Sequence, residues 1–405
     1  MLTGHDIICM GLMSWQNDSA KPTQQLLIEL ARHNRVLFVN YAYTLKDVWQ
    51  HVRGQKQIPL AQVTGRTDRL TYHELPNGRG LHVLIPSAVL PINALRPGGL
   101  YDALLRWNTH SVLRDTRRAM RQLGFGRPIV LNALHPTLGV GLAGRLGEKA
   151  LVYHCYDAIE AQARSRSHGP AAEPKFMRRA DAVVTTSVAL ANDKRAVQPR
   201  CYVVENGADS RHFGQANVPR AHRQPKTIGY VGAVDNRLDA DLLYRCFRRF
   251  AHLRFLLVGR VPDPAFAQRL GQFPNVTLAG PQPPEDLPHW VTQMDVGLVP
   301  FGKNAQTRVI CPVNINAYLA AGLPVVSTDF ADLSGFGSLV RVGMTAGSFM
   351  AGIEAALAET DPDLPRQRAA LAEANSWESR GRQFADVLER VLNPTKPTTS
   401  VVEYA

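Results

Sequence analysis

The segment Pro312-Val-Asn-Ile-Asn-Ala-Tyr-Leu-Ala-Ala-Gly-Leu-Pro-Val-Val326 decides the fold. It predicts a helix over residues 313–321, because proline is favoured where a helix begins and Gly322 is a residue typical of a helix end. The apolar residues 324–327 then predict a short buried strand. A helix that passes through a glycine turn into a buried strand is one unit of a parallel α/β sheet.

The same alternation of helix and strand patterns extends along the chain on both sides of this segment. In the second half we predict strands at 227–231, 254–258, 276–278 and 296–299, and helices at 239–250 and 285–294. In the first half we predict strands at 6–12, 35–40, 128–133, 150–156 and 181–186, and helices at 22–33 and 100–123, whereas residues 50–80 show no pattern. Near-continuous apolar strands are typical of a parallel sheet covered on both faces. The sequence therefore predicts an α/β fold with two Rossmann-like domains.

Length and composition agree with two globular domains. The chain has 405 residues, 45% hydrophobic and 20% charged, so it is too apolar for a disordered protein and too long for a small disulfide scaffold. Its five cysteines form no Cys-x-x-Cys pair, which suits a reducing compartment and gives no zinc site. No run approaches about 18 apolar residues and the first residues lack a basic leader, so we expect a cytoplasmic protein without a spanning segment.

The positive charge of the chain is confined to its first half. Residues 1–200 carry 26 Lys and Arg against 14 Asp and Glu, and the remaining residues carry 20 of each, which accounts for the net charge of +12. This asymmetry predicts an anionic partner such as nucleic acid, anionic lipid or a phosphorylated substrate, although it also serves solubility. One face of the predicted helix 100–123 is basic; its residues are Arg106, Arg114, Arg117, Arg118 and Arg121.

Two strand ends in the second half have the composition of an anion site. Gly229-Tyr230-Val231-Gly232 follows a predicted strand, and glycines there let backbone N–H groups approach a phosphate; Arg237 follows five residues later. The helix that begins after Pro312 also exposes free N–H groups and the positive end of its dipole. Two such helix starts suit a diphosphate, although a glycine-rich turn alone can also be structural.

The segment 312–326 resembles the signature Pro-x-Lys-x-x-Glu-Tyr-Leu-Ala-Ala-Gly-x-Pro-Val-Val of nucleotide-sugar glycosyltransferases with the GT-B fold. Further blocks resemble the same family in order and spacing; they are Asp181–Ser187, Val204–Phe213, Pro274–Gly280, Met294–Phe301 and Ser376–Arg380. The resemblance covers about 150–390 well and is greatest to bacterial enzymes of exopolysaccharide or teichuronic-acid assembly.

The resemblance implies a GT-B architecture, in which two Rossmann-like domains face each other across a cleft. Residues 1–205 would form the acceptor-binding domain and 206–375 the nucleotide-sugar-binding domain. A C-terminal helix over 376–395 would pack back on the first domain, and 396–405 would be a flexible tail.

The chain departs from the family signature at two positions. Asn314 stands where the family has lysine, and Ala317 stands where it has the glutamate that usually holds the ribose hydroxyls. The paired glutamates of the retaining branch would fall at Val309 and Ala317. We therefore expect an inverting enzyme, and a retaining enzyme or an inactive nucleotide-binding protein remain as alternatives.

The candidate donor-binding residues lie at predicted strand ends and helix starts of the second domain. Cations and amides near the signature helix are expected to replace the missing contacts, and Gly280 with Pro281 to frame the base, for which family frequency favours uracil. The set is Gly229, Tyr230, Gly232, Arg237, Gly259, Gly280, Pro281, Phe301, Lys303, Arg308, Asn314 and Asn316.

An inverting transfer needs one general base that deprotonates the acceptor hydroxyl. Asp157 follows the predicted strand 150–156, and a similar strand precedes the base aspartate of the xanthan-assembly glucuronosyltransferases, which also have the GT-B fold. Asp157 can equally cap the following helix. His135, after the strand 128–133, is the second candidate base or a structural histidine, and Asp18 in the first polar loop is a third group near acceptor or phosphate.

Neither a metal nor another cofactor is expected besides the nucleotide-sugar donor. Asp239-Ala-Asp241 and Asp361-Pro-Asp363 have Asp-x-Asp spacing, but they lie in a predicted helix and a terminal loop, and the family stabilises the leaving diphosphate with helix dipoles and basic side chains. The resemblance implies a UDP-sugar, a lipid-linked saccharide acceptor and an anionic membrane surface at the inner face of the plasma membrane. Nucleic acid is not expected as a partner, because the sequence has no recognisable stacking platform. A dinucleotide oxidoreductase is not expected either, because the third glycine of its Gly-x-Gly-x-x-Gly motif is missing.

Overall fold

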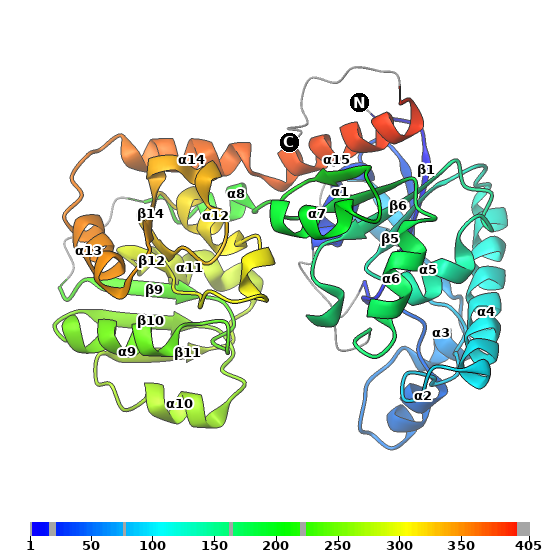
Figure 1. The fold of residues 1–405 in the computed structure, drawn as a ribbon, viewed down its shortest axis with the longest axis horizontal. Helices are drawn as coiled ribbons and strands as arrows, with labels where there is room; N and C mark the ends of the chain where they lie inside the picture. Colours follow the sequence, from blue (N-terminus) through cyan, green and yellow to red (C-terminus); the bar gives the residue numbers. More distant parts are fainter. Residues whose placement is uncertain (1, 16–21, 76–77, 162–164, 219–223, 395–405) are drawn as a thin grey trace. The chain divides into compact units, whose positions relative to one another are not determined.

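The computed structural model describes residues 2–15, 22–75, 78–161, 165–218 and 224–394 (Figure 1). The chain forms two compact units, which we describe separately. The first comprises Met1–Glu205 and Gly381–Ala405, and the second comprises Asn206–Arg380. The division falls inside helix α15 (Trp377–Leu392), so residues of the helix expected over 376–395 belong to both units. The residues of the expected tail, 396–405, lie outside the described part.

The first unit is built on a sheet of eight strands in the order β3-β4-β2-β1-β5-β6-β7-β8. Every neighbouring pair is parallel except the edge pair β3–β4. The strands are β1 (Asp6–Gly11), β2 (Arg35–Val39), β3 (Leu70–Glu74), β4 (Gly80–Leu84), β5 (Ile129–Ala133), β6 (Ala150–Cys155), β7 (Ala182–Thr185) and β8 (Cys201–Val203). The helices are α1 (Pro22–Leu30), α2 (Leu45–Val52), α3 (Leu60–Thr64), α4 (Gly99–Leu123), α5 (Pro136–Leu142), α6 (Gly169–Met177) and α7 (Val188–Arg195), with a 3-10 turn η1 (Ile159–Ala161).

The second unit contains a six-stranded parallel sheet in the order β11-β10-β9-β12-β13-β14. Its strands are β9 (Thr227–Val231), β10 (Arg254–Val258), β11 (Val276–Gly280), β12 (Val296–Val299), β13 (Val325–Thr328) and β14 (Val340–Gly343). Its helices are α8 (Ser210–Gly214), α9 (Ala240–Arg249), α10 (Pro264–Leu270), α11 (Leu287–Thr292), α12 (Val313–Ala320), α13 (Ala346–Leu357) and α14 (Leu364–Ala374), with 3-10 turns η2 (Pro284–Asp286), η3 (Thr307–Val309) and η4 (Ser334–Leu339).

Both sheets have the doubly wound arrangement of a Rossmann fold. In the second unit the strand order reads 3-2-1-4-5-6 from β9 onward, so the order reverses between β9 and β12. In the first unit the reversal lies between β1 and β5. Ligands of such sheets bind beyond the carboxyl ends of the strands at this reversal. The expected fold, with two Rossmann-like domains, is therefore confirmed.

In the second unit, side chains from outside the sheet pack closely against glycines of its strands. A Cβ added at Gly229 would lie 2.0 Å from the Met294 sulfur, and one added at Gly297 would lie 2.5 Å from the ring of Tyr318. Tyr318, on α12, is fully buried. The signature helix is thus locked against the middle of the sheet, beside the strand reversal.

Candidate functional site

The signature helix α12 is bonded directly to the end of strand β9. The backbone N–H of Val231 donates to the Tyr318 hydroxyl at 2.7 Å, and the Asn314 side-chain N–H donates to the Val231 carbonyl at 2.6 Å. Asn314 stands where the family signature has lysine. Its side-chain amide is hydrogen-bonded to strand β9, and it supplies no positive charge at this position. Pro312, which caps α12, makes no side-chain hydrogen bond, so the first turn of this helix is capped by no side chain.

Backbone alone forms the neighbouring strand ends. Gly232 and Gly259 both have φ of 148°, and a Cβ on Gly259 would lie 1.9 Å from the Gly232 carbonyl oxygen. The Gly232 N–H donates to Val258 O, and the Gly259 N–H donates to Gly280 O, each at 2.9 Å. Gly280 has φ of 70°, and a Cβ there would meet no atom within 4 Å. The ends of β9, β10 and β11 thus each carry a glycine, and no side chain at these three positions keeps a ligand from the backbone. We call these three glycine positions the side-chain-free edge.

The two predicted cations nearest to this edge are held by carboxylates. Arg237 binds both oxygens of Asp235, at 2.8 and 2.9 Å, and its guanidinium lies 5.7 Å from the centre of the Phe301 ring. Lys303 is 2.7 Å from Asp329. Arg308, in the turn before α12, is exposed, as is Pro281 after β11. A phosphate would have to compete with Asp235 and Asp329 for the first two cations.

Four of the predicted donor-binding residues are packed into the core of the second unit. Gly229 lies inside β9 against Met294. Tyr230 is 1% exposed and donates to the Ala233 carbonyl, and Phe301 is 3% exposed. Asn316 is 1% exposed and its Oδ1 accepts a hydrogen bond from Asn375. The signature pattern placed these residues near the site but did not separate the buried from the open face of each element.

In the first unit, the turn after β5 presents His135 in a constrained backbone. Leu134, which precedes it, has φ of 55°, a left-handed conformation that is uncommon for a residue with a side chain and that clusters at functional sites. Its N–H donates to His154 O at 3.1 Å. The turn is therefore built to hold the next residue in one place.

The buried side chain of Asn132 fixes the peptide of His135 on both sides. Asn132 Oδ1 accepts from the His135 N–H at 2.9 Å, and Asn132 Nδ2 donates to the His135 carbonyl at 3.1 Å. The His135 ring lies beside Thr137, with Nδ1 3.4 Å from its hydroxyl, and 6.4 Å from the ring of Tyr41. The sequence placed Asn132 at a strand end without assigning it a role; a polar residue closing an apolar strand was the available signal.

Asp157 emerges at the same edge of the sheet as His135, because β5 and β6 are parallel neighbours with Ala133 opposite His154. The side chain is half-buried and its Oδ1 accepts from the Ala158 N–H at 2.8 Å. Asp157 thus lies at the turn that leads into η1. Asp18, the third candidate, lies outside the described residues.

Other acids with suggestive spacing serve as helix caps or surface groups. Asp239 accepts from the Leu242 N–H at the start of α9, whereas Asp361 accepts from the N–H of Asp363 in an exposed turn. Within the described ranges, no three His, Cys, Asp or Glu side chains form a group that could hold a metal ion.

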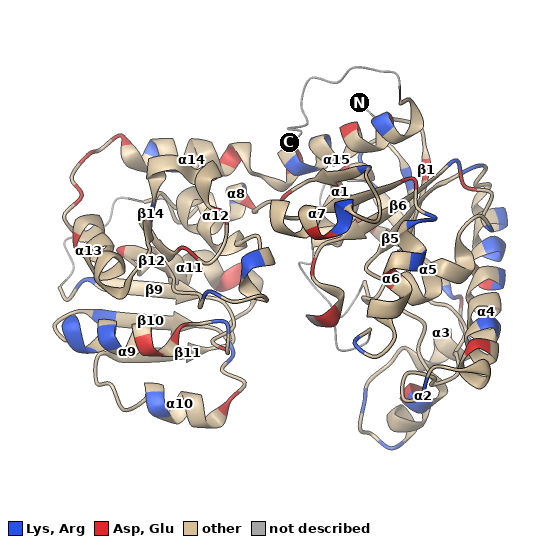
Figure 2. Ribbon diagram, in the orientation of Figure 1, with Lys and Arg blue, Asp and Glu red and all other residues tan. Residues whose placement is uncertain are grey.

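The basic face of α4 is real, but its arginines differ in their surroundings (Figure 2). Arg114 binds Asp115 and Ser87, and Arg117 donates to the Arg145 carbonyl. Arg106, Arg118 and Arg121 are exposed, and their side chains have no partner in the described part of the chain. The face therefore offers three uncommitted guanidinium groups to an anionic partner.

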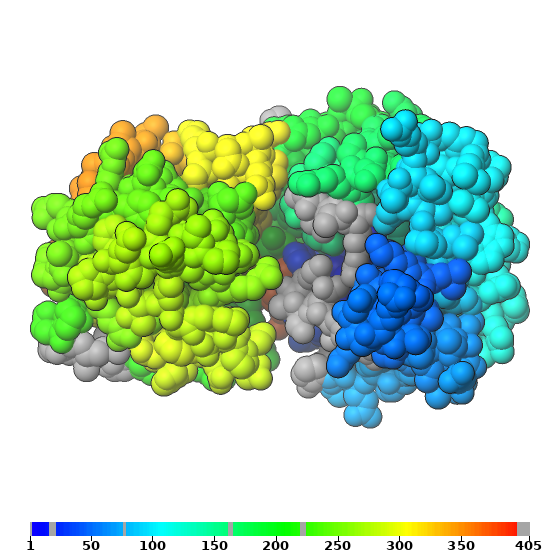
Figure 3. Space-filling view, turned by 90° about the horizontal axis from the view of Figure 1, so that it is seen from below, coloured from blue at the N-terminus to red at the C-terminus, as the bar shows by residue number. Residues whose placement is uncertain are grey.

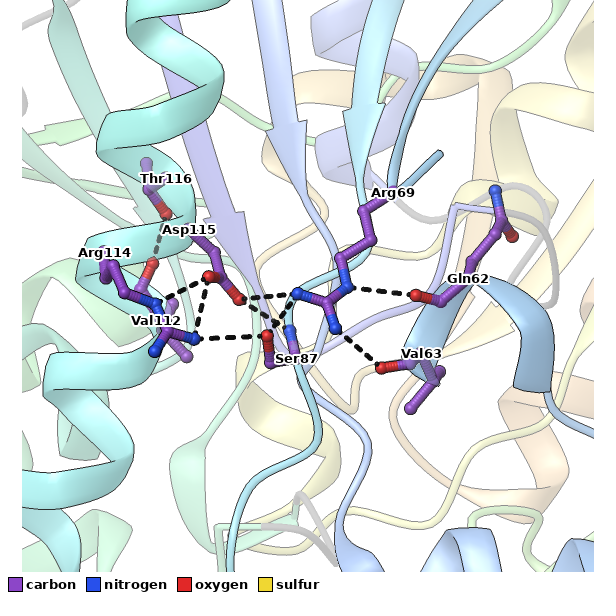
Figure 4. A network of polar contacts seen from close by, with 8 residues as sticks. All are labelled: Gln62, Val63, Arg69, Ser87, Val112, Arg114, Asp115 and Thr116. Atoms are coloured by element: carbon purple, nitrogen blue, oxygen red, sulfur yellow. Dashed lines mark hydrogen bonds and ion pairs between the residues drawn. The ribbon is translucent and has the colours of Figure 1, made fainter. Parts of the chain in front are cut away.

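Asp115 joins this helix to the neighbouring elements of the first unit (Figure 4). The carboxylate accepts from the Ser87 N–H at 2.8 Å and lies 3.8 Å from Arg69, which in turn donates to the carbonyls of Gln62 and Val63 at the end of α3. The network bounds a cavity of about 490 Å³ between α3 and α4, lined in part by Arg118. Arg114 and Arg69 are thus structural cations.

No helix in the ranges that the structure describes is long and apolar enough to cross a bilayer.

Three comparisons with known proteins bear on this site. Residues 225–360 match the family model described as glycosyl transferases group 1. Over 207 residues the chain is 28% identical to a protein of Bacillus subtilis (strain 168) named as a teichuronic acid biosynthesis glycosyltransferase, TuaH; the match covers 45% of this chain and 51% of that protein. The chain thus spans about half the length of this curated relative.

Solved structures show the same fold over nearly the whole chain. Sucrose-phosphate synthase from Thermosynechococcus elongatus has a TM-score of 0.64 at 16% identity, covering 96% of this chain and 100% of that one. A glycosyltransferase from Rickettsia africae has a TM-score of 0.64 at 11% identity, covering 97% and 100%. The resemblance read from the sequence is confirmed for the GT-B fold, and residues 225–360 match the group 1 glycosyltransferases.

Proposed function

We propose that this protein is a glycosyltransferase that moves a sugar from a nucleoside-diphosphate sugar, a UDP-sugar by family frequency, to a lipid-linked or polysaccharide acceptor in bacterial cell-surface glycan assembly. The observation that carries the proposal is the side-chain-free edge of β9, β10 and β11 beside the start of α12, inside the segment that matches group 1 glycosyltransferases. The named relative supports the glycan class.

The donor diphosphate is proposed to lie at the N-terminus of α12. The first-turn N–H groups and the helix dipole would stabilise the charge that develops on the leaving diphosphate, so the step is proposed to need no metal. Asn314 and Tyr318 keep this helix start fixed on β9, a positioning role in place of direct phosphate contact. Exposed Arg308 is the cation proposed to reach the phosphates.

Asp157 is proposed as the general base of an inverting reaction. Its carboxylate would take the proton of the acceptor hydroxyl as that oxygen bonds to the anomeric carbon and the bond to the diphosphate breaks. His135, on the neighbouring strand end, is the second candidate for this base. The uncharged Val309 and Ala317 support inversion over the retaining alternative. The loss of the family cation at Asn314 favours the inactive nucleotide-binding alternative, which the same experiment separates.

Transfer and donor binding, measured on the same variant, test this proposal. We expect Asp157→Asn to lower sugar transfer by more than about a hundredfold, the lower end of the range for a lost general base, and to leave the affinity for UDP unchanged. The exposed Asp193 on α7 of the same unit, changed to Asn, is the matched control and should transfer normally. Full transfer by Asp157→Asn rules it out as base, and UDP binding without any wild-type transfer to a panel of glycan acceptors favours the inactive alternative.

The basic first unit supports a peripheral position at an anionic membrane surface on the cytoplasmic side. This unit carries 29 Lys and Arg against 18 Asp and Glu, whereas the second carries 17 against 16. Lipid-linked acceptors lie at such a surface, and each basic group near it contributes about 1 kcal/mol. Arg106, Arg118 and Arg121 are the side chains proposed to make this contact.

A further inference from the structure

Helix α2 of the first unit turns its apolar side outward. Leu45, Trp49 and Val52 are 51%, 50% and 73% exposed, and their i, i+4, i+7 spacing places them on one face of the helix. A surface helix of a globular protein normally buries that face. Large apolar residues gathered on an exposed face mark an interaction site.

The opposite face of α2 is anchored mainly by polar groups, so the fold does not need the outward residues. Asp47 is 8% exposed and accepts from both the N–H and the hydroxyl of Thr44, at 2.7 Å each. The N–H of Ile58 donates to the His51 ring at 3.2 Å. Val48 alone adds an apolar contact, against the small cluster that includes Ile58. The helix is therefore held in place while its apolar face stays available.

The first half of α4, near α2, also exposes large apolar side chains. Leu45 N–H donates to Val89 O, and the next residue, Leu90, donates its N–H to Asn108 of α4, both at 2.9 Å. The two helices accordingly lie side by side within the first unit, and Figure 3 shows the blue surface of α2 beside the cyan surface of α4. On α4, Leu100 is 67% exposed and Trp107 is 53% exposed. Two of the five tryptophans of the chain thus face solvent on neighbouring helices.

Basic groups border these apolar residues. Lys46 and Arg106 are exposed and have no partner among the residues that the structure places, and the Arg53 guanidinium lies 3.7 Å from the centre of the Trp49 ring. Of the acids on the two helices, Asp47 and Asp115 are buried and paired, and Asp102 in the first turn of α4 is exposed. The surface therefore combines apolar side chains, tryptophan and a positive excess.

We propose that Leu45, Trp49, Val52, Leu100 and Trp107 enter the headgroup region of an anionic lipid bilayer, with Lys46, Arg53 and Arg106 on the lipid phosphates. We call these residues the α2–α4 face. The inference deepens the membrane association proposed above and rests on it. Tryptophan favours the bilayer interface, and an amphipathic helix with cations at its apolar border lies in the interface plane. The occupant is a lipid surface rather than a second copy, because a symmetric dimer would set the same cations against one another.

Vesicle binding of two matched variants tests the α2–α4 face. We expect the wild type to sediment with phosphatidylcholine vesicles that contain phosphatidylglycerol, and weakly with phosphatidylcholine alone. Trp49→Gln should lower the partition coefficient by about tenfold, the loss of one buried aromatic group. Val52→Gln should lower it as well. The control Met344→Gln removes a side chain that is 77% exposed in the second unit, and should bind as the wild type does.

Affinity for UDP, measured on the same samples, separates this inference from the proposed transferase activity. Trp49→Gln should keep wild-type affinity, since its side chain lies in the first unit and α12 in the second. Wild-type protein that ignores anionic vesicles, or Trp49→Gln and Val52→Gln that bind them as well as wild type, overturns the inference. A wild-type dimer that Trp49→Gln dissociates, in protein that binds no vesicles, overturns it too. Wild-type protein that binds vesicles but does not bind UDP would contradict the proposed donor site and leave the membrane inference intact.

Discussion

At the scale of single residues, the turn after β5 is the most constrained feature of the first unit. Leu134 adopts a left-handed backbone, and Asn132 holds both the N–H and the carbonyl of His135. These contacts determine where the His135 side chain starts. They identify Asn132 as a positioning residue, because its own amide is directed at backbone.

Replacing Asn132 should therefore affect turnover more than donor binding. We expect Asn132→Ala to lower kcat for sugar transfer by about ten- to a hundredfold, with KM for the donor unchanged, because His135 is then misplaced at the sheet edge that it shares with the proposed base Asp157. The free energy of unfolding should fall by about 1–3 kcal/mol because two backbone groups lose their partner. Exposed Asn192, changed to Ala, is the control. A lowered unfolding free energy with unchanged kcat would assign Asn132 to stability only.

His154 supplies a prediction for the dependence of stability on pH. It is 1% exposed with Nδ1 3.0 Å from the Thr23 hydroxyl, and burial lowers its pKa from 6.5 to about 3. The unfolded chain binds this proton more readily, so the folded state is favoured fully above pH 6.5 and loses stability as the pH falls toward 3.

Between pH 6 and pH 4 the free energy of unfolding should fall more steeply with decreasing pH for the wild type than for His154→Gln. The difference in slope should be up to about 1.4 kcal/mol per pH unit. Urea unfolding at several pH values measures it. Exposed His289, changed to Gln, should leave the wild-type slope intact. Equal slopes for wild type and His154→Gln would mean that the ring is protonated in the folded protein.

Whether the sequence could predict the surroundings of a single residue depended on which face of its helix or strand the residue occupies. The pattern around Gly232, Gly259 and Gly280 correctly indicated strand ends free of side chains. It could not show that Tyr230, Phe301 and Asn316 point inward, since neighbouring residues of a strand or helix differ in burial and only packing distinguishes them. It also could not foresee that Arg237 pairs with Asp235, a contact made two residues away.

At the scale of elements, the connection between α12 and β9 determines the geometry of the proposed donor site. The Tyr318 hydroxyl accepts the N–H of Val231, and this hydroxyl is fully buried. A buried N–H that loses its partner keeps its desolvation cost. Any change in this bond should therefore be felt both in stability and at the helix start.

Tyr318→Phe should lower the free energy of unfolding by about 1–3 kcal/mol and weaken UDP binding, because Val231 loses its partner and the helix start becomes looser. Chemical denaturation and calorimetric titration measure the two effects. Tyr244 is a matched control in the same unit, since its buried hydroxyl has no partner among the placed residues. Tyr244→Phe should match or exceed wild-type stability. Identical behaviour of both variants would show that the hydroxyl bond to β9 contributes nothing.

The sequence analysis left several elements unpredicted, among them α2, α3 and the edge strands β3 and β4 between residues 45 and 84. Helix α2 exposes Leu45, Trp49 and Val52 and anchors Asp47 and His51 inward, so its pattern is the reverse of that of an ordinary surface helix. Strand β3 is a half-exposed edge strand. Neither gives the buried apolar signal from which the other strands were predicted.

At the scale of the whole molecule, the alternation of apolar strands and amphipathic helices was sufficient to predict the fold. Parallel strands buried on both faces give near-continuous apolar runs, and both sheets consist mainly of such strands. The two units differ in their chemical features. The excess positive charge belongs to the first unit, and the proposed donor edge belongs to the second. Charge could indicate an anionic partner but not its identity, whereas the signature helix indicated a nucleotide sugar.

A crystal structure of the protein soaked with saturating UDP tests the central claim most directly. The account predicts a diphosphate within hydrogen-bond distance of the first-turn N–H groups of α12, with the uridine beside Gly280 and Pro281. A diphosphate bound elsewhere on the chain, or an edge of β9, β10 and β11 that stays empty while UDP is in excess, would contradict it.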